Sequence, residues 1–133
     1  MVEKISHIGI AVTSLEAQIP FYRDVLGLEF LGLETVEDQK VKTAMFKVGD
    51  TRIELLEPTA EDSPIAKFLE KRGQGIHHIA YQVDDCRKAV QRMEATGVQM
   101  IDKEPRRGAG GHTIAFAHPK YTFGILTELT QEH

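Results

Sequence analysis

Two stretches of the chain share one pattern of apolar and polar positions. Residues 5–12, ISHIGIAV, alternate between apolar and small or polar side chains, which is typical of a strand with one buried face. An amphipathic pattern with helical spacing follows and ends at Gly27. Residues 77–100 repeat this order, with His78 in the place of His7, 71 positions later. The repeat predicts two strand–helix modules of the same design.

After each helix the pattern changes to period two, which predicts three further strands in each module. We expect these strands near residues 28–33, 42–48 and 52–56 in the first module, and near 99–101, 112–117 and 125–129 in the second. Residues 63–73 predict a short helix between the modules, with Ser63 as its N-cap and Pro64 in its first turn. The expected N-caps of the two other helices are Ser14 and either Asp84 or Asp85.

This order of elements predicts an α+β fold built from two βαβββ modules. One such module cannot cover both faces of its own sheet, so we expect the two to pair in a single domain, residues 1–133, and to form a cupped sheet. The first module spans about residues 1–60, the connecting helix about 63–73 and the second module about 75–133. No linker rich in proline, glycine or serine separates the modules.

Composition narrows the classes of function. Hydrophobic residues make up 41% of the 133 residues and charged residues 27%, which fits an ordered domain. The formal net charge of −4 argues against nucleic acid as the main partner, and no apolar run is long enough to cross a bilayer. The strand pattern begins almost at Met1, so we expect no signal peptide. With Cys86 as the single cysteine, we expect an inert thiol and a cytoplasmic protein.

Strand alternation places one histidine and one glutamate of each module on the side of its sheet that faces away from the helices. These residues are His7 and Glu54 in the first module and His78 and Glu128 in the second, at intervals of 47 and 50 residues. A glutamate within an apolar strand is costly unless it is paired, protonated or bound to a metal. A lone histidine or glutamate in a strand is more often structural, but four in matched order favour a site for one divalent ion such as Zn, Co, Ni, Mn or Fe.

One basic cluster accompanies glycines late in the chain. Arg106 and Arg107 precede the segment GAGG, and Lys120 follows in the segment HPK. Glycines allow the backbone to approach an anion closely, and the cations supply charge. These three residues are therefore candidates for holding an anionic group. The alternative is a hairpin whose charges are only solvated.

The paired histidines and glutamates in two βαβββ modules resemble the vicinal oxygen chelate superfamily, which includes glyoxalase I. The segments HIGIAV, FYRDVLGL, IELLEP, SPIAKFLEKRG, GIHHIAYQVDD and the later HPK resemble the methylmalonyl-CoA epimerases of that superfamily over nearly the whole chain. The resemblance implies the glyoxalase-like fold and a CoA thioester substrate. The 2R and 2S forms of that substrate would be interconverted through a metal-stabilised enolate. It also implies a homodimer.

Residue by residue, the resemblance implies one divalent ion bound by His7, Glu54, His78 and Glu128. Glu128 is expected to act both as a ligand and as one acid–base group. Some members of the superfamily carry another carboxylate where Thr43 stands in this chain. The second acid–base group is therefore expected to be Glu54 or a water held by Thr43. The CoA phosphates are expected to be held by Arg106, Arg107 and Lys120.

Two other functions stay open at this point. A glyoxalase I-like lactoylglutathione lyase uses the same metal ligands and also moves a proton next to a carbonyl group. Glutathione, however, needs groups that bind carboxylates, whereas the HPK and RRGAGG segments suit phosphates. A non-catalytic ligand-binding module of the resistance type needs no metal, and the four candidate ligands argue against it.

Overall fold

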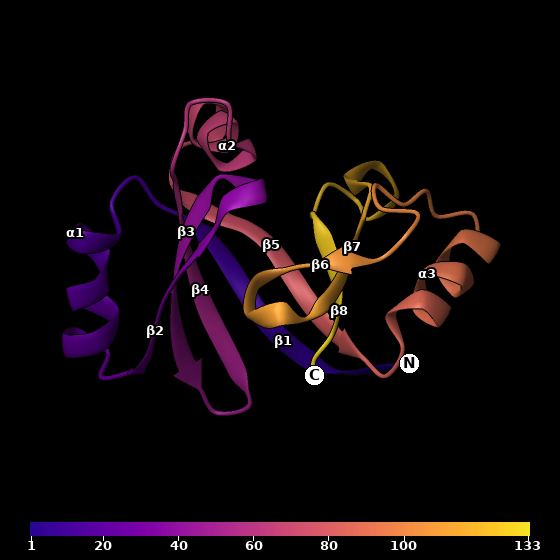
Figure 1. The fold of residues 1–133 in the computed structure, drawn as a ribbon, viewed down its shortest axis with the longest axis horizontal. Coiled ribbons are helices and arrows are strands. Elements are labelled where there is room, and N and C mark those ends of the chain that lie inside the picture. Colours follow the sequence, from indigo (N-terminus) through magenta and orange to yellow (C-terminus); the bar gives the residue numbers. More distant parts are fainter. The chain divides into compact units, whose positions relative to one another are not determined.

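The contacts of the chain divide it into two units, and Figure 1 colours the chain along its sequence from indigo at the N-terminus to yellow at the C-terminus. The computed structural model describes all residues from Met1 to His133. The first unit comprises residues 7–77, and the second comprises residues 78–133 together with residues 1–6. Strand β1 (Val2–Ala11) enters the first unit at His7, and strand β5 (Gly75–Val83) enters the second at His78.

The first unit folds as one βαβββ module followed by a helix. Its strands lie in the order β2–β3–β4–β1, with β1 parallel to β4 and the other neighbours antiparallel. The other elements are α1 (Leu15–Pro20), β2 (Glu29–Val36), β3 (Val41–Val48), β4 (Thr51–Pro58) and α2 (Pro64–Arg72). Gly49 and Asp50 form the tight turn between β3 and β4, and Gly49 has the positive φ of 58° that such a turn favours.

Each face of this sheet packs against a different helix. Leu15 of α1 packs with Phe46 and Leu55, together with Val12 and Ala44, on one face. We call the other face, which carries His7 and Glu54, the histidine face of the first unit. At one end of the histidine face, Ile65 of α2 packs with three buried residues of the sheet: Ala11, Val41 and Leu56. The alternation therefore assigns the side chains to the correct faces. The expectation that the histidine face lies away from the helices holds for α1 but not for α2, which covers one end of that face.

The first helix is less regular than its sequence pattern indicates. Its N-cap is Ser14, whose hydroxyl oxygen accepts a hydrogen bond from the Ala17 amide at 3.1 Å. Pro20 has no amide hydrogen to donate. Beyond Pro20 the chain forms a π-helical turn, Phe21–Val25, in which the Leu26 amide donates to the Phe21 carbonyl at 2.9 Å.

The second unit repeats the βαβββ order. The strands lie in the order β5–β8–β7–β6, with β5 parallel to β8 and the others antiparallel. The elements after β5 are α3 (Cys86–Ala95), β6 (Arg106–Arg107), β7 (Thr113–Ala117) and β8 (Thr127–Gln131). Asp85 caps α3, which packs Ala89 and Val90 into a core with Val83, Ala115 and Leu129. The predicted α+β fold of two βαβββ modules is confirmed.

One expected strand is reduced to a single bridge. The pattern predicts a strand at residues 99–101, but only Met100 pairs there, in a bridge with Ala117. The carboxylate of Asp102 accepts the Phe116 amide at 2.9 Å, so a side chain takes the place of further backbone pairing. The edge strand forms later, as β6. Among all these elements, no helix combines the length and the apolar character needed to cross a membrane.

Candidate active site

The first histidine–glutamate pair lies on the histidine face of the first unit. Gly9 of β1 is the register partner of Glu54 on β4, so His7, two positions earlier on the same face, lies beside that carboxylate. His7 Nε2 and Glu54 Oε1 are 3.6 Å apart. Both residues are buried, with 8% and 4% of their surface exposed. Gly9 has no side chain to fill the space beside them.

The second unit repeats this arrangement in the same register. Ala80, two positions after His78, is the partner of Glu128 on β8. His78 Nε2 and Glu128 Oε1 are 3.3 Å apart, and each residue is 4% exposed. The ring of His78 also meets the ring of Phe116 edge to face, with the centroids 5.6 Å apart. We call this side of the second sheet its histidine face.

The chemistry of each pair fits metal binding. Burial strips water from a carboxylate, which is costly unless a partner compensates its charge. In each unit an imidazole lies beside the buried carboxylate, at 3.6 Å in the first and 3.3 Å in the second. Imidazole nitrogen and carboxylate oxygen together are ligands of Zn, Mn, Co and related ions. Each pair therefore supplies a donor set that suits a divalent metal ion.

Thr43 lies on the same face as Glu54 and offers a hydroxyl instead of a carboxylate. It is buried on β3, and its hydroxyl donates a hydrogen bond to the backbone oxygen of Glu34 at 3.3 Å. Met45, the next residue on this face of β3, is the register partner of Glu54. Glu54 is therefore the one carboxylate that β3 and β4 present on this face, while the Thr43 oxygen can still accept a hydrogen bond.

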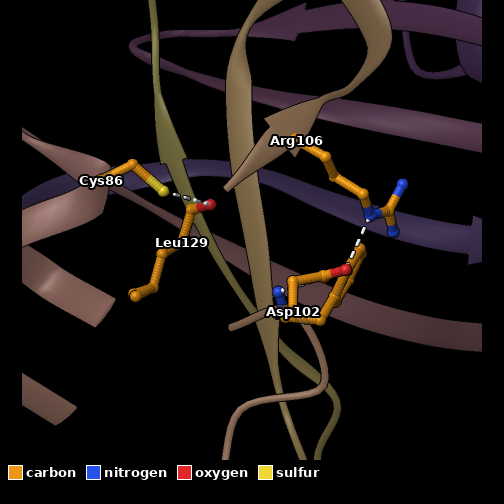
Figure 2. Close-up of polar contacts among 5 residues, drawn as sticks. Cys86, Asp102, Arg106 and Leu129 are labelled. Carbon is orange, nitrogen blue, oxygen red and sulfur yellow. Dashed lines mark hydrogen bonds and ion pairs between the residues drawn. The ribbon is translucent and has the colours of Figure 1, made fainter. Parts of the chain in front are cut away.

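The three cations of the late basic cluster do not share one surface. Arg106 and Arg107 are consecutive in β6, so their side chains point to opposite faces of the sheet. The guanidinium of Arg106 lies over the ring of Phe116. Its Nε donates to Asp102 Oδ1 at 2.9 Å (Figure 2). Lys120 is exposed in the 3₁₀ turn Pro119–Tyr121.

Sequence reasoning misses Asp102 and Phe116, although both carry a signal. Asp102 precedes Arg106 by four residues, the spacing of a local ion pair. Phe116 alternates with Ala115 and Ala117, whose side chains lie in the core against α3. Alternation therefore places the Phe116 ring on the histidine face, where Glu128 is its register partner.

Cys86 is a buried thiol on the other side of the second sheet. Although it begins α3, it is fully buried, with its Sγ 3.9 Å from the Leu129 carbonyl oxygen (Figure 2). Burial, followed by the negative charge of Glu128, raises the pKa of the Cys86 thiol to about 11. These surroundings agree with the inert thiol expected from the sequence.

His77 is adjacent to His78 in sequence but belongs to the first unit and has a different environment. Its ring meets the ring of Phe68 on α2 edge to face, with the centroids 5.0 Å apart. Burial lowers the pKa of His77 to about 4, so the imidazole is neutral at physiological pH. This packing indicates a structural role for His77.

Comparison with known proteins shows similarity along nearly the whole chain. Residues 6–116 match the model of the glyoxalase/bleomycin resistance protein/dioxygenase superfamily. The chain is 48% identical to the YqjC protein of Bacillus subtilis over 128 residues, which are 96% of this chain and 91% of that one. It is 41% identical to an ethylmalonyl-CoA/methylmalonyl-CoA epimerase of Cereibacter sphaeroides over 133 residues, covering 98% of this chain and 99% of that one.

Solved structures show the same similarity in three dimensions. A methylmalonyl-CoA epimerase in complex with methylmalonyl-CoA and NH4+ matches with a TM-score of 0.96 at 41% identity, covering 99% of this chain and 96% of that chain. By contrast, a lactoylglutathione lyase of Arabidopsis thaliana is 24% identical over 122 residues, which are 42% of that longer protein.

Proposed function

Because this chain belongs to the glyoxalase/bleomycin resistance protein/dioxygenase superfamily, we propose that it is a metal-dependent epimerase that interconverts the 2R and 2S forms of methylmalonyl-CoA. The observation that carries this proposal is the buried histidine–glutamate pair that recurs in the same register in both modules. Two further findings support it. Relatives named as methylmalonyl-CoA epimerases match nearly the whole chain, and one of them has been solved with methylmalonyl-CoA.

We propose that one divalent ion is held by His7, Glu54, His78 and Glu128. The support is the chemistry of the donor set: two imidazoles and two carboxylates, all buried. When bound, such an ion polarises the thioester carbonyl and stabilises the enolate formed on proton loss. The proposal requires the two modules to act as a single domain, residues 1–133, because each contributes two of the four ligands.

Epimerisation also needs groups that move a proton. The proton leaves one face of the α-carbon and returns to the other, so two acid–base groups are required. We assign Glu128 as one of them and Glu54 as the other, with a water held by Thr43 as the alternative to Glu54. The two glutamates belong to equivalent strands of the two modules, which suits them to opposite faces of the α-carbon.

The cations Arg106, Arg107 and Lys120 are proposed to bind the anionic groups of the CoA thioester. For Arg107, the proposal is supported by the backbone of the neighbouring glycine, Gly111. Gly111 has a φ of 76°, and a Cβ atom there would lie 3.2 Å from Nη2 of Arg107. A side chain at position 111 would therefore crowd the guanidinium of Arg107. Glycine allows that guanidinium to lie directly against the backbone. Such a combination of backbone and cation suits a phosphate.

A lactoylglutathione lyase is the weaker candidate. It shares the superfamily, and its chemistry also moves a proton next to a carbonyl group. The named lyase is 24% identical to this chain, against 41% for the named epimerase, and it is a longer protein of which this chain covers less than half. A non-catalytic binding module is a third possibility. Such a module needs no metal, so the four buried candidate ligands argue against it.

Proton exchange in D₂O tests the proposed reaction. Protein loaded with Mn or Co is incubated with methylmalonyl-CoA, and deuterium at the α-carbon is followed by NMR. We expect rapid incorporation by the wild type and almost none by His78→Ala or after chelation. If the loaded wild type exchanges nothing but turns over the methylglyoxal–glutathione hemithioacetal, the chain is a lyase. If it acts on neither substrate, the enzymatic proposal is wrong.

We also propose that the protein is a cytoplasmic homodimer. Phe21, Val25 and Leu26 expose large apolar side chains along the π-helical turn after α1, and Val25 is 73% exposed. Covering them with a second copy would remove this apolar surface from water. A single buried cysteine is compatible with a reducing compartment. Sedimentation equilibrium of the wild type and of Val25→Glu tests dimerisation. The wild type should be a dimer, and the substitution should yield monomers.

A further inference from the structure

Asp102 holds Arg106 in place by using both of its carboxylate oxygens. Oδ1 accepts a hydrogen bond from Arg106 Nε at 2.9 Å, and Oδ2 accepts one from the Phe116 amide at 2.9 Å. The side chain of Asp102 is only 14% exposed. Figure 2 shows the resulting contact between Asp102 and the guanidinium. The position of Arg106 Nε is therefore tied to strand β7 through one largely buried carboxylate.

Phe116 is the second side chain that contacts the same guanidinium. The Cζ atom of Arg106 is 5.6 Å from the centroid of the Phe116 ring, a cation–π distance. The same ring contacts the imidazole of His78, and its residue is the register partner of Glu128. Arg106 therefore lies on the histidine face of the second unit, separated from His78 by a single aromatic ring.

The two terminal nitrogens of Arg106 have no hydrogen-bond partner in the protein. Of the five N–H donors of a guanidinium, Asp102 takes the one on Nε, and four remain on Nη1 and Nη2. The side chain is 39% exposed, so a ligand can reach these donors. A planar pair of donors held in this way suits the two oxygens of a carboxylate or phosphate.

The position of Arg106 favours the carboxylate of the acyl group over a CoA phosphate. The nearest phosphate of CoA lies about thirteen covalent bonds from the thioester sulfur, roughly 15 Å along an extended arm with bonds near 1.5 Å. The free carboxylate of a malonyl-type acyl group is attached to the α-carbon itself. A cation one ring away from His78 is therefore placed for the acyl end of the substrate.

We propose that Arg106, positioned by Asp102 and Phe116, binds the free carboxylate of the acyl group and selects dicarboxylic over monocarboxylic acyl thioesters. This inference rests on the proposed function, since it concerns the acyl specificity of the same site. It gives Arg106 and Arg107 different roles. The side chain of Arg107 points to the opposite face of β6, and Arg107 keeps its proposed role of binding a phosphate of CoA.

Malonyl-CoA and acetyl-CoA test this proposal because they differ by one carboxylate. Both are titrated calorimetrically into protein loaded with Mn, with metal content checked for each variant. Arg106→Gln should weaken malonyl-CoA binding about tenfold or more, as expected for hydrogen bonds to a charged group, and leave acetyl-CoA within about twofold. Arg106→Lys, which keeps the charge but not the planar fork, should lose part of the preference. The matched control Arg107→Gln should weaken both ligands by the same factor.

Asp102→Asn measures the positioning of Arg106 through the same ratio. The amide still offers one acceptor oxygen but no charge, so the preference for malonyl-CoA should fall while acetyl-CoA affinity stays the same. If Arg106→Gln weakens the binding of malonyl-CoA and acetyl-CoA equally, Arg106 binds a phosphate and not the acyl carboxylate. If it weakens the binding of neither, Arg106 does not contact the substrate. If the preference depends on Arg106 but no α-deuterium exchange is found, the carboxylate site stands and the proposed reaction fails.

Discussion

Each buried glutamate of the site has a histidine as its neighbour, at 3.6 Å in the first unit and 3.3 Å in the second. The proposed site requires a divalent ion beside each carboxylate, because a neutral imidazole does not cancel the charge of a carboxylate. This requirement makes single isosteric changes informative. Replacing a carboxylate by an amide keeps its shape and one ligand oxygen but removes its ability to accept a proton at neutral pH.

Glu128→Gln should retain much of the bound metal and lose most of the activity. Loss of a general base costs about 10²–10⁴-fold, so α-deuterium incorporation should fall by a factor in that range. Thr43→Val, on the histidine face of the first unit, should cost clearly less. Metal content and exchange rate are measured on the same samples. A loaded Glu128→Gln that exchanges at the wild-type rate would contradict the assignment of Glu128.

The thiol of Cys86 should react slowly with alkylating reagents in the folded protein. Its ordinary pKa of 9.0 is raised to about 11, so the protonated form dominates throughout the physiological range and the thiolate appears only as the pH approaches 11. At pH 8 the thiol is therefore almost entirely protonated, and it is also buried. Mass spectrometry after iodoacetamide treatment should show little labelling of native protein and full labelling in denaturant. Rapid native labelling at pH 8 would overturn this expectation.

At the scale of elements, the glycine segment between β6 and β7 is held by close packing as well as by backbone freedom. The Gly108 amide donates to the His112 carbonyl at 2.9 Å, which closes the loop. A Cβ atom at Gly108 would lie 2.7 Å from Cδ1 and 2.9 Å from Cγ2 of Ile114, a buried residue of β7. β-branched Ile114 has few rotamers with which to move aside.

Gly108→Ala should therefore destabilise the protein by about 1–3 kcal/mol, the usual cost of overpacking. For a chain of this size that corresponds to a fall of several degrees in Tm. Gly75→Ala is the matched control, since a Cβ atom there meets nothing within 4 Å and its φ is not positive. Thermal unfolding of the two variants by circular dichroism makes the comparison. An unchanged Tm for Gly108→Ala would show that Ile114 can repack.

At the scale of the whole molecule, a metal bound by both modules should stabilise the entire chain. A ligand that binds only the folded state adds about 2.7 kcal/mol at one hundred times its Kd. Addition of Mn or Co should therefore raise Tm in one cooperative transition. His7→Ala and His78→Ala should each abolish this shift, although they change different units. If each variant still binds an ion, the two histidine–glutamate pairs are separate sites and the single-domain site is wrong.

The sequence alone determined the repeated module, the face of each candidate ligand and the N-caps Ser14 and Ser63, and it narrowed the N-cap of α3 to Asp84 or Asp85. These features follow from local rules: a period of two in strands, helical spacing, and the side chains that satisfy free amides at a helix start. The spacing of His7 to Glu54 and of His78 to Glu128 shows the repeat directly. No long-range information is needed for any of them.

The tertiary structure decided which side chains meet. Strand register alone brings Gly9 opposite Glu54, Ala80 opposite Glu128 and Arg106 opposite Ile114. The Asp102 carboxylate replaces part of the strand expected at residues 99–101. Each of these outcomes depends on a partner that is distant in the chain. Local periodicity records which face a side chain occupies, but not what lies opposite it.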